Sequence, residues 1–325
     1  MTAISSVLGP TFPNRAYLLA ATSFGHLTTS DGAPPAGGYK PINGTTFDLL
    51  DKNHITWADY FQDAPQGSIF RSSDPHFLPL KSFLAQAAAG TLPQVCFIDP
   101  DFGGDRREND EHPPTDIQRG QAYVSQVVNA IRNSPSWQDS VIFITYDEHG
   151  GFYDHVAPPH APQADQSNPD GISPGQCADL SNPPASLQPG GGAGCRANLL
   201  SNTDTSLNNA IALCPALAAN PTGPYPAECA NFDQLGIRVP FIAVSPFSKR
   251  HYVSHTVGDH TSLLAFIEKR FMSTPNGTDA STHQHLTKRD QSANPLEDLF
   301  DFDAAPSLGI TLTHAAPPTV DCTPK

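Results

Sequence analysis

The amino-acid sequence predicts an α/β fold in which helices pack on a mostly parallel central sheet. Short apolar, β-branched runs alternate with helical stretches along the chain, which is the pattern of a doubly wound sheet. Two of the apolar runs end in acidic residues, and in open α/β sheets ligands bind where the strands end. The chain has 325 residues, enough to bury one large core.

The first expected helix begins near Pro13, because proline suits a first helical turn. A later helix should end at Gly90, which can adopt the left-handed backbone of a helix end. The run at 140–145 should be a strand buried on both faces of a parallel sheet, since it is apolar throughout. Helices are expected at 13–23, 46–50, 80–89, 122–131 and 263–271, and strands at 55–60, 92–100, 140–145 and 237–246.

The composition limits the classes of partner. The chain has 18 Lys and Arg against 32 Asp and Glu, a net charge of -14, which argues against nucleic acid as a partner. No apolar run approaches the roughly 20 residues that span a bilayer. The first residues lack the charged and apolar regions of a signal peptide.

Four of the six cysteines lie in a Pro- and Gly-rich stretch at about 157–236, which we expect to be an insertion. Their spacing matches no zinc site, so disulfides, and therefore an oxidising compartment, are the interpretation we favour. Their pairing allows three connectivities, and the sequence does not choose among them. Cys96 lies in an apolar run and is expected to act as a small buried hydrophobe. Residues 273–325 are predicted to be an irregular tail.

An acidic pair, Asp147 and Glu148, follows the run at 140–145 and is itself followed by His149 and two glycines. Neighbouring carboxylates repel one another unless a cation or hydrogen-bond donors hold them. A hard divalent metal ion is the expected cation. The alternative is a solvated acidic loop that caps the next segment.

Two further residues are candidates for the same edge. Thr11 should lie at or just before a helix N-terminus, where anions such as phosphate are favoured; the alternative is a simple helix cap. His112 lies in a polar loop one crossover before the strand at 140–145, and a stray surface histidine is the alternative there. Thr261, Ser262 or Asp259 could cap the helix at 263–271.

Four motifs together resemble the bacterial and fungal phosphoesterase family of phosphatidylcholine-type phospholipases C and a related acid phosphatase. That family belongs to the alkaline-phosphatase-like superfamily. The resemblance implies a three-layer α/β/α sandwich with a mostly parallel central sheet, formed here by one domain at 1–272. The motifs are Gly9-Pro10-Thr11-Phe12-Pro13-Asn14-Arg15, His112-Pro113-Pro114, Thr145-Tyr146-Asp147-Glu148-His149-Gly150-Gly151-Phe152-Tyr153-Asp154-His155 and Asp259-His260-Thr261-Ser262.

The resemblance also implies a metal-assisted phosphoric ester hydrolase with one divalent metal ion. Thr11 would be the nucleophile and a metal ligand, Asp147 and Glu148 would bind the metal, and His112 would protonate the leaving oxygen. The remaining matched residues would contact the substrate or support the residues that do: Asn14, Arg15, His149, Asp259 and His260.

A phospholipid is the expected substrate, with transient contact to a membrane surface, and the full-length protein would be secreted, periplasmic or on the cell surface. A phosphomonoesterase acting on small phosphate esters and a truncated inactive relative are the alternatives. Members of the family carry a Glu-Asn metal-binding motif upstream of the nucleophile turn, and the sequence has no such motif. We therefore expect an N-terminally truncated member that lacks half of the metal's ligands.

Overall fold

The computed structural model describes residues 2–23, 29, 37–41, 43–103, 108–161, 234–272, 284–309 and 311–319. The predicted insertion at 157–236 lies outside these residues except at its two ends. Cys177, Cys195, Cys214, Cys229 and Cys322 also lie outside them. Cys96 is a free thiol, half-buried, and burial raises its pKa to about 12.

A parallel sheet of three strands forms the middle of the molecule, with β2 (Trp57–Phe61) between β3 (Phe77–Pro79) and β4 (Val95–Ile98). Both pairings of β2 are parallel. Neighbouring residues of β2 face opposite sides of this sheet. Trp57 packs in a core cluster with α1, α2 and α8, and Tyr60 packs in a second cluster with α3 and α4. This arrangement confirms an α/β fold with a parallel sheet.

The strand that precedes the acidic pair differs from its prediction. β5 (Ile142–Thr145) pairs antiparallel with β6 (Phe241–Val244), and of the four β5 residues only Ile142 is buried. The apolar run is explained by aromatic packing on one face, where the Phe143 ring lies 5.0 Å from that of Phe266 and 5.7 Å from that of Phe241. The three-layer sandwich remains a prediction, because the described strands fall into three separate hydrogen-bonded groups.

The predicted helices form, although several begin earlier than the sequence suggested. Asp116 accepts the backbone N–H of Gln118 and so starts α4 at Ile117. Gly90 ends α3 with a φ of 69°, as predicted. No helix within the described residues is long and apolar enough to cross a membrane. The helices are α1 (Thr11–Ala20), α2 (Thr46–Lys52), α3 (Leu80–Ala89), α4 (Ile117–Arg132), α8 (His260–Phe271) and α9 (Lys288–Ser292), with short 3-10 turns at η1 (Gln66–Ile69), η2 (Trp137–Asp139) and η5 (Glu297–Leu299).

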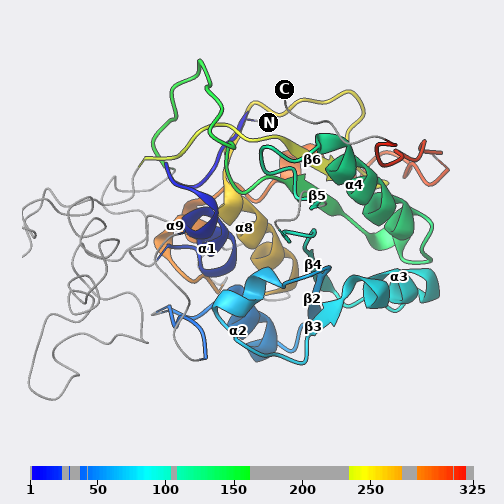
Figure 1. Ribbon diagram of the computed structural model, residues 1–325, viewed down its shortest axis with the longest axis horizontal. Coiled ribbons are helices and arrows are strands. Elements are labelled where there is room, and N and C mark those ends of the chain that lie inside the picture. Colours follow the sequence, from blue (N-terminus) through cyan, green and yellow to red (C-terminus); the bar gives the residue numbers. More distant parts are fainter. Residues whose placement is uncertain are drawn as a thin grey trace, which may run out of the picture.

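Segments from both ends of the chain meet around α1 and α8. Figure 1 shows α1, α8 and α9 grouped together, while α3 and α4 lie on the other side of the strands. β1 (Thr2–Ala3) pairs in parallel with β7 (Val257–Gly258), which leads directly into α8. The start of the chain is thereby placed beside the first turn of α8.

Part of the predicted irregular tail is ordered and packed. It contains α9, and the side chains of Leu296 and Phe300 are buried. Arg289 and Asp290 are buried as well, so this segment is held by charged groups as much as by apolar ones. A periodicity of apolar residues cannot reveal such a segment, and this is why the sequence predicted a tail.

Candidate functional site

Thr11 is the first residue of α1 and is half-buried. It is preceded by Pro10, which makes no side-chain cap. The turn before the helix is shaped by the buried Asn14. Its Oδ1 accepts the N–H of Val7 at 3.1 Å, and its Nδ2 donates to the carbonyl oxygens of Gly9 at 2.8 Å and Pro10 at 3.1 Å. Asn14 therefore braces the turn that presents Thr11.

Arg15 joins α1 to the acidic pair across 132 positions of sequence. Its Nε donates to Oδ2 of Asp147 at 2.9 Å, and both side chains remain partly exposed. The guanidinium carbon also lies 4.5 Å from the centre of the Phe102 ring, a cation–π contact. The helix that begins with Thr11 and the loop after β5 are thus held at one place.

The acidic pair sits in a tight turn stabilised by donors. Oδ1 of Asp147 accepts the N–H of Glu148 at 2.9 Å, and Oε2 of Glu148 accepts the N–H of Gly150 at 2.8 Å. Gly150 and Gly151 have φ angles of 64° and 77°, in the left-handed region that glycine tolerates best. Nδ1 of His149 lies 3.4 Å from Oε2 of Glu148, so His149 borders this turn.

His260, the first residue of α8, lies behind the acidic turn and is buried. Its Nε2 is 3.0 Å from the carbonyl oxygen of Tyr146, and its Nδ1 is 3.1 Å from Oγ of Ser6. Burial lowers the pKa of His260, which makes the ring neutral at pH 7. Because a carbonyl can only accept, Nε2 carries the proton and Ser6 donates to Nδ1. His260 thereby fixes the residue just before Asp147.

Asp259 is placed away from solvent and acts as the N-cap of α8. Its Oδ1 accepts the N–H of Thr261 at 2.9 Å, and its Oδ2 accepts from Nε of Arg289 at 3.2 Å. Of the three candidate caps, Asp259 is the one that occupies the position, in a capping box with Ser262. Its carboxylate anchors the start of the helix.

The loop of His112 packs against the acidic turn, although the imidazole itself points to solvent. The Tyr146 hydroxyl donates to the Glu111 carboxylate, and Cδ of Pro113 lies 3.6 Å from the position of a Cβ on Gly150. His112 is exposed, and its Nδ1 donates to the carbonyl of Pro113 at 2.7 Å. Within the described residues, His112 makes no hydrogen bond or ion pair with Thr11, Asp147 or Glu148.

Sequence reasoning missed four residues that assemble this region: Ser6, Phe102, Glu111 and Tyr146. Glu111 and Tyr146 adjoin candidate residues, so their positions were a usable signal. Ser6 and Phe102 are recruited by contacts far along the chain, for which the sequence holds no local signal.

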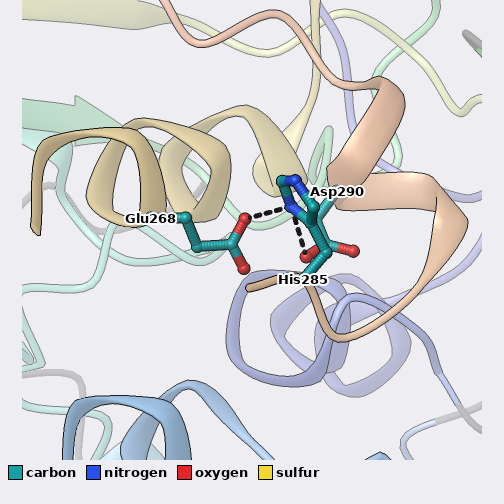
Figure 2. Close-up of side chains that lie close together, drawn as sticks. All are labelled: Glu268, His285 and Asp290. Atoms are coloured by element: carbon teal, nitrogen blue, oxygen red, sulfur yellow. Dashed lines mark hydrogen bonds and ion pairs between the residues drawn. The ribbon is translucent and has the colours of Figure 1, made fainter. Parts of the chain in front are cut away.

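A second cluster of titratable side chains consists of Glu268 on α8, Asp290 on α9 and His285 between the two helices (Figure 2). Nδ1 of His285 is 2.7 Å from Oε2 of Glu268 and 3.6 Å from Oδ2 of Asp290. One ligand atom from each residue lies within 4.8 Å of the others, so this donor set could hold a metal ion. Burial by itself disfavours the imidazolium, but the hydrogen bonds to Asp290 and Glu268 outweigh it and raise the pKa of His285 to about 10.

Burial also raises the pKa of Glu268 to about 9, against the lowering effect of its hydrogen bond from His285. The raised pKa values of Glu268 and His285 both describe one proton, which lies between Oε2 of Glu268 and Nδ1 of His285. We place it on Nδ1, because Asp290 holds a negative charge beside the ring: hydrogen bonds from His285 and the backbone outweigh burial and lower its pKa. An imidazolium between two carboxylates therefore ties α8 to α9.

The divalent ion implied by the resemblance can be tested against the acidic turn. Asp147 and Glu148 offer carboxylate oxygens, the ligands that hard divalent cations prefer. Asp147 spends one contact on Arg15 and one on a backbone N–H, and a carboxylate has about four lone-pair positions. The residue types therefore fit such an ion, with Thr11 as a third oxygen donor on the neighbouring helix.

Comparisons with known proteins identify the family of the chain. The model of the phosphoesterase family matches residues 2–272. The chain is 32% identical over 336 residues to non-specific phospholipase C6 of Arabidopsis thaliana, covering 98% of this chain and 50% of that protein. It is 29% identical over 359 residues to a non-hemolytic phospholipase C of Pseudomonas aeruginosa, covering 98% of this chain and 45% of that protein.

A further similarity is confined to part of the chain. A non-hemolytic phospholipase C of Burkholderia pseudomallei is 36% identical over 183 residues, 56% of this chain and 19% of that protein. The chain thus spans about half the length, or less, of these three relatives. Because the family model covers most of the chain, the protein belongs to the phosphoesterase family.

Proposed function

We propose that this chain is a phosphoric ester hydrolase of the phospholipase C type, acting on phosphatidylcholine-like phosphodiesters. The observation that carries the proposal is the Arg15–Asp147 contact, which brings the helix of Thr11 and the acidic turn to one place. The names of the similar proteins favour a phospholipase C. A hydroxyl, two carboxylates and a guanidinium at one site suit the transfer of a phosphoryl group.

In the proposed reaction, the Thr11 hydroxyl loses its proton to water, and its Oγ1 attacks phosphorus in line and displaces the diacylglycerol oxygen. A bond forms between Thr11 and phosphorus, the ester bond to diacylglycerol breaks, and His112 donates a proton to the departing alkoxide. Water then hydrolyses the phospho-threonine and releases the phosphorylated head group. His112 must approach the site for this step, since its Nδ1 donates to the carbonyl of Pro113 and its side chain is exposed.

Charge at the site would be controlled by Arg15 and the acidic pair. A divalent ion held by Asp147, Glu148 and Thr11 would lower the pKa of the Thr11 hydroxyl and neutralise charge on the phosphoryl oxygens. Arg15 would use its two Nη groups to orient those oxygens, while its Nε keeps Asp147 in place. Asn14 and His260 would position the two loops without touching substrate.

The test compares two soluble chromogenic substrates, p-nitrophenyl phosphorylcholine and p-nitrophenyl phosphate, with added divalent metals and with chelator. We expect chelator-sensitive cleavage that favours the phosphorylcholine ester, and a loss of at least about a thousandfold in Thr11→Ala. Thr11→Ser should retain part of the activity, because it keeps a hydroxyl.

Each other outcome has a defined meaning. A preference for the monoester would move the substrate class to that of an acid phosphatase. Full activity in Thr11→Ala would remove Thr11 as the nucleophile. No cleavage of either ester by the wild-type chain would indicate an inactive relative.

A further inference from the structure

Each of the three loops that carry the proposed site also exposes apolar side chains to solvent. Leu8, in the turn before Thr11, is 57% exposed, and Ile117, just after the loop of His112, is 55% exposed. Phe152 and Tyr153, just after the acidic turn, are 69% and 90% exposed. We call these four residues the apolar rim. Single exposed apolar residues are ordinary on proteins, but a set that recurs on every site loop calls for an explanation.

Contacts between the loops bring together the segments that carry the rim. The Arg15–Asp147 pair joins the segment of Leu8 to that of Phe152 and Tyr153. The Tyr146–Glu111 hydrogen bond and the approach of Pro113 to Gly150 join the segment that leads to Ile117 to the same turn. Figure 1 shows the segment before α1 and the loop after β5 close together, away from α2 and α3.

The two aromatic residues of the rim differ in what they contribute to the fold. The Phe152 ring folds back over the acidic turn, with ring atoms 3.2 and 3.3 Å from the position of a Cβ on Gly150. Tyr153 makes no side-chain hydrogen bond to any described residue and extends into solvent. A tyrosine has an apolar ring and a polar tip, which suits the boundary between water and lipid.

The charges near the rim indicate which surface it fits. The sequence has no lysine in the segments 5–15, 111–117 and 146–155. Arg15 is paired with Asp147, and Arg238 forms a two-pronged contact with Asp154 at 2.7 and 2.8 Å. With a net charge of -14 on the chain, an anionic surface would be repelled, whereas a neutral zwitterionic one would not.

We propose that the apolar rim docks on the surface of a zwitterionic phospholipid bilayer. Leu8, Ile117, Phe152 and Tyr153 enter the boundary between head groups and acyl chains, so that Thr11 and Asp147 face a head group at the surface. The inference rests on the proposed function for its purpose, but the docking itself can be measured without turnover.

Docking is tested by co-sedimentation with phosphatidylcholine vesicles, using Thr11→Ala throughout to suppress hydrolysis. The rim variant is Ile117→Ser with Tyr153→Ser, which leaves in place the Phe152 ring on the acidic turn. The control is Val253→Ser with Leu308→Ser, two apolar residues outside the site loops that are 66% and 50% exposed. We expect the rim variant to bind about tenfold more weakly and the control to bind as the parent does. Ile117→Trp with Tyr153→Trp should bind at least as tightly as the parent, which excludes misfolding as the cause of a loss.

A second readout is turnover, measured with the same rim variant in a chain that keeps Thr11. The rim variant should hydrolyse vesicle phosphatidylcholine more slowly by a similar factor, while cleavage of soluble p-nitrophenyl phosphorylcholine stays unchanged. An equal loss on both substrates would overturn the docking proposal, because the two residues would then act in the pocket. Equal losses in the rim and control variants, or binding that requires added anionic lipid, would overturn it as well. Rim-dependent vesicle binding by a chain that cleaves neither substrate would uphold docking and reject the proposed function.

Discussion

Two arginine–aspartate pairs in this molecule have nearly the same local chemistry and different surroundings. In each, Nε of the arginine contacts Oδ2 of the aspartate, at 2.9 Å for Arg15–Asp147 and 3.2 Å for Arg289–Asp259. Each guanidinium also lies over an aromatic ring, of Phe102 or of Tyr17. The first pair is 21% and 24% exposed, whereas the second is 0% and 3% exposed.

The two pairs differ in how many hydrogen-bonding groups they leave available for a ligand. Arg289 also donates from Nη2 to the carbonyl of Ser6 at 2.5 Å, and Asp259 caps α8, so the buried pair is committed to holding three segments together. Arg15 makes one hydrogen bond within the described residues, through Nε, and its side chain is 21% exposed. Burial and saturation therefore separate a structural ion pair from one that can still bind a ligand.

The largest expected effect is on stability at the buried pair. Arg289→Met should lower the free energy of unfolding by about 3–5 kcal/mol, because it leaves the Asp259 carboxylate buried without its cation. Arg15→Met should cost less than about 1 kcal/mol, since its pair is partly exposed. Urea unfolding of the two variants measures this contrast. Equal losses would contradict the distinction drawn between the pairs, and Arg289→Lys, which keeps the charge, should recover part of the stability.

The converse effect should appear in catalysis. Arg15→Met is expected to reduce turnover of the preferred chromogenic ester by about a hundredfold, the usual cost of losing a donor to the transition state. Arg15→Lys should be intermediate, because it keeps the charge and loses the fork. Steady-state kinetics with a thermal unfolding scan on each variant separates this loss from instability. Wild-type kinetics in Arg15→Met would remove Arg15 from the site.

A smaller effect is expected on the pH dependence of stability, through the contacts of His285 with Glu268 and Asp290. The pKa of His285 is raised to about 10 in the folded chain, above the value of about 6.5 for a free histidine. The folded state therefore binds this proton more tightly. Its stabilisation is complete below about pH 6.5 and is lost as the pH rises towards 10.

We expect the free energy of unfolding to fall by about 2 kcal/mol between pH 7 and pH 10, with a much flatter profile in His285→Gln. Chemical unfolding across this range tests the expectation. Parallel profiles in the two chains would mean that other groups cause the loss. Thr11→Ala is the matched control, because Thr11 lies outside this network.

Most residues of the candidate site could be proposed from the sequence because they cluster in short motifs. Asp147, Glu148 and the two glycines adjoin one another, and a left-handed turn at Gly150 and Gly151 follows from local backbone chemistry. Most helices were predicted because their apolar residues and end signals are local too. Thr11 was placed at a helix start for the same reason, since Pro13 limits the backbone around it.

Tertiary contacts decided what those motifs touch. Arg15 reaches Asp147 across 132 positions, and Ser6 reaches His260 across 254, distances over which no pattern in the sequence specifies a partner. The antiparallel pairing of β5 with β6, the role of Asp259 as a cap and the burial of Arg289 and Asp290 have the same origin. The sequence by itself determined the acidic turn and the helix start that present the candidate side chains, because both depend on neighbouring residues. Only the tertiary structure decided which charged side chains are buried and which remain partly exposed, because burial depends on segments that meet after folding.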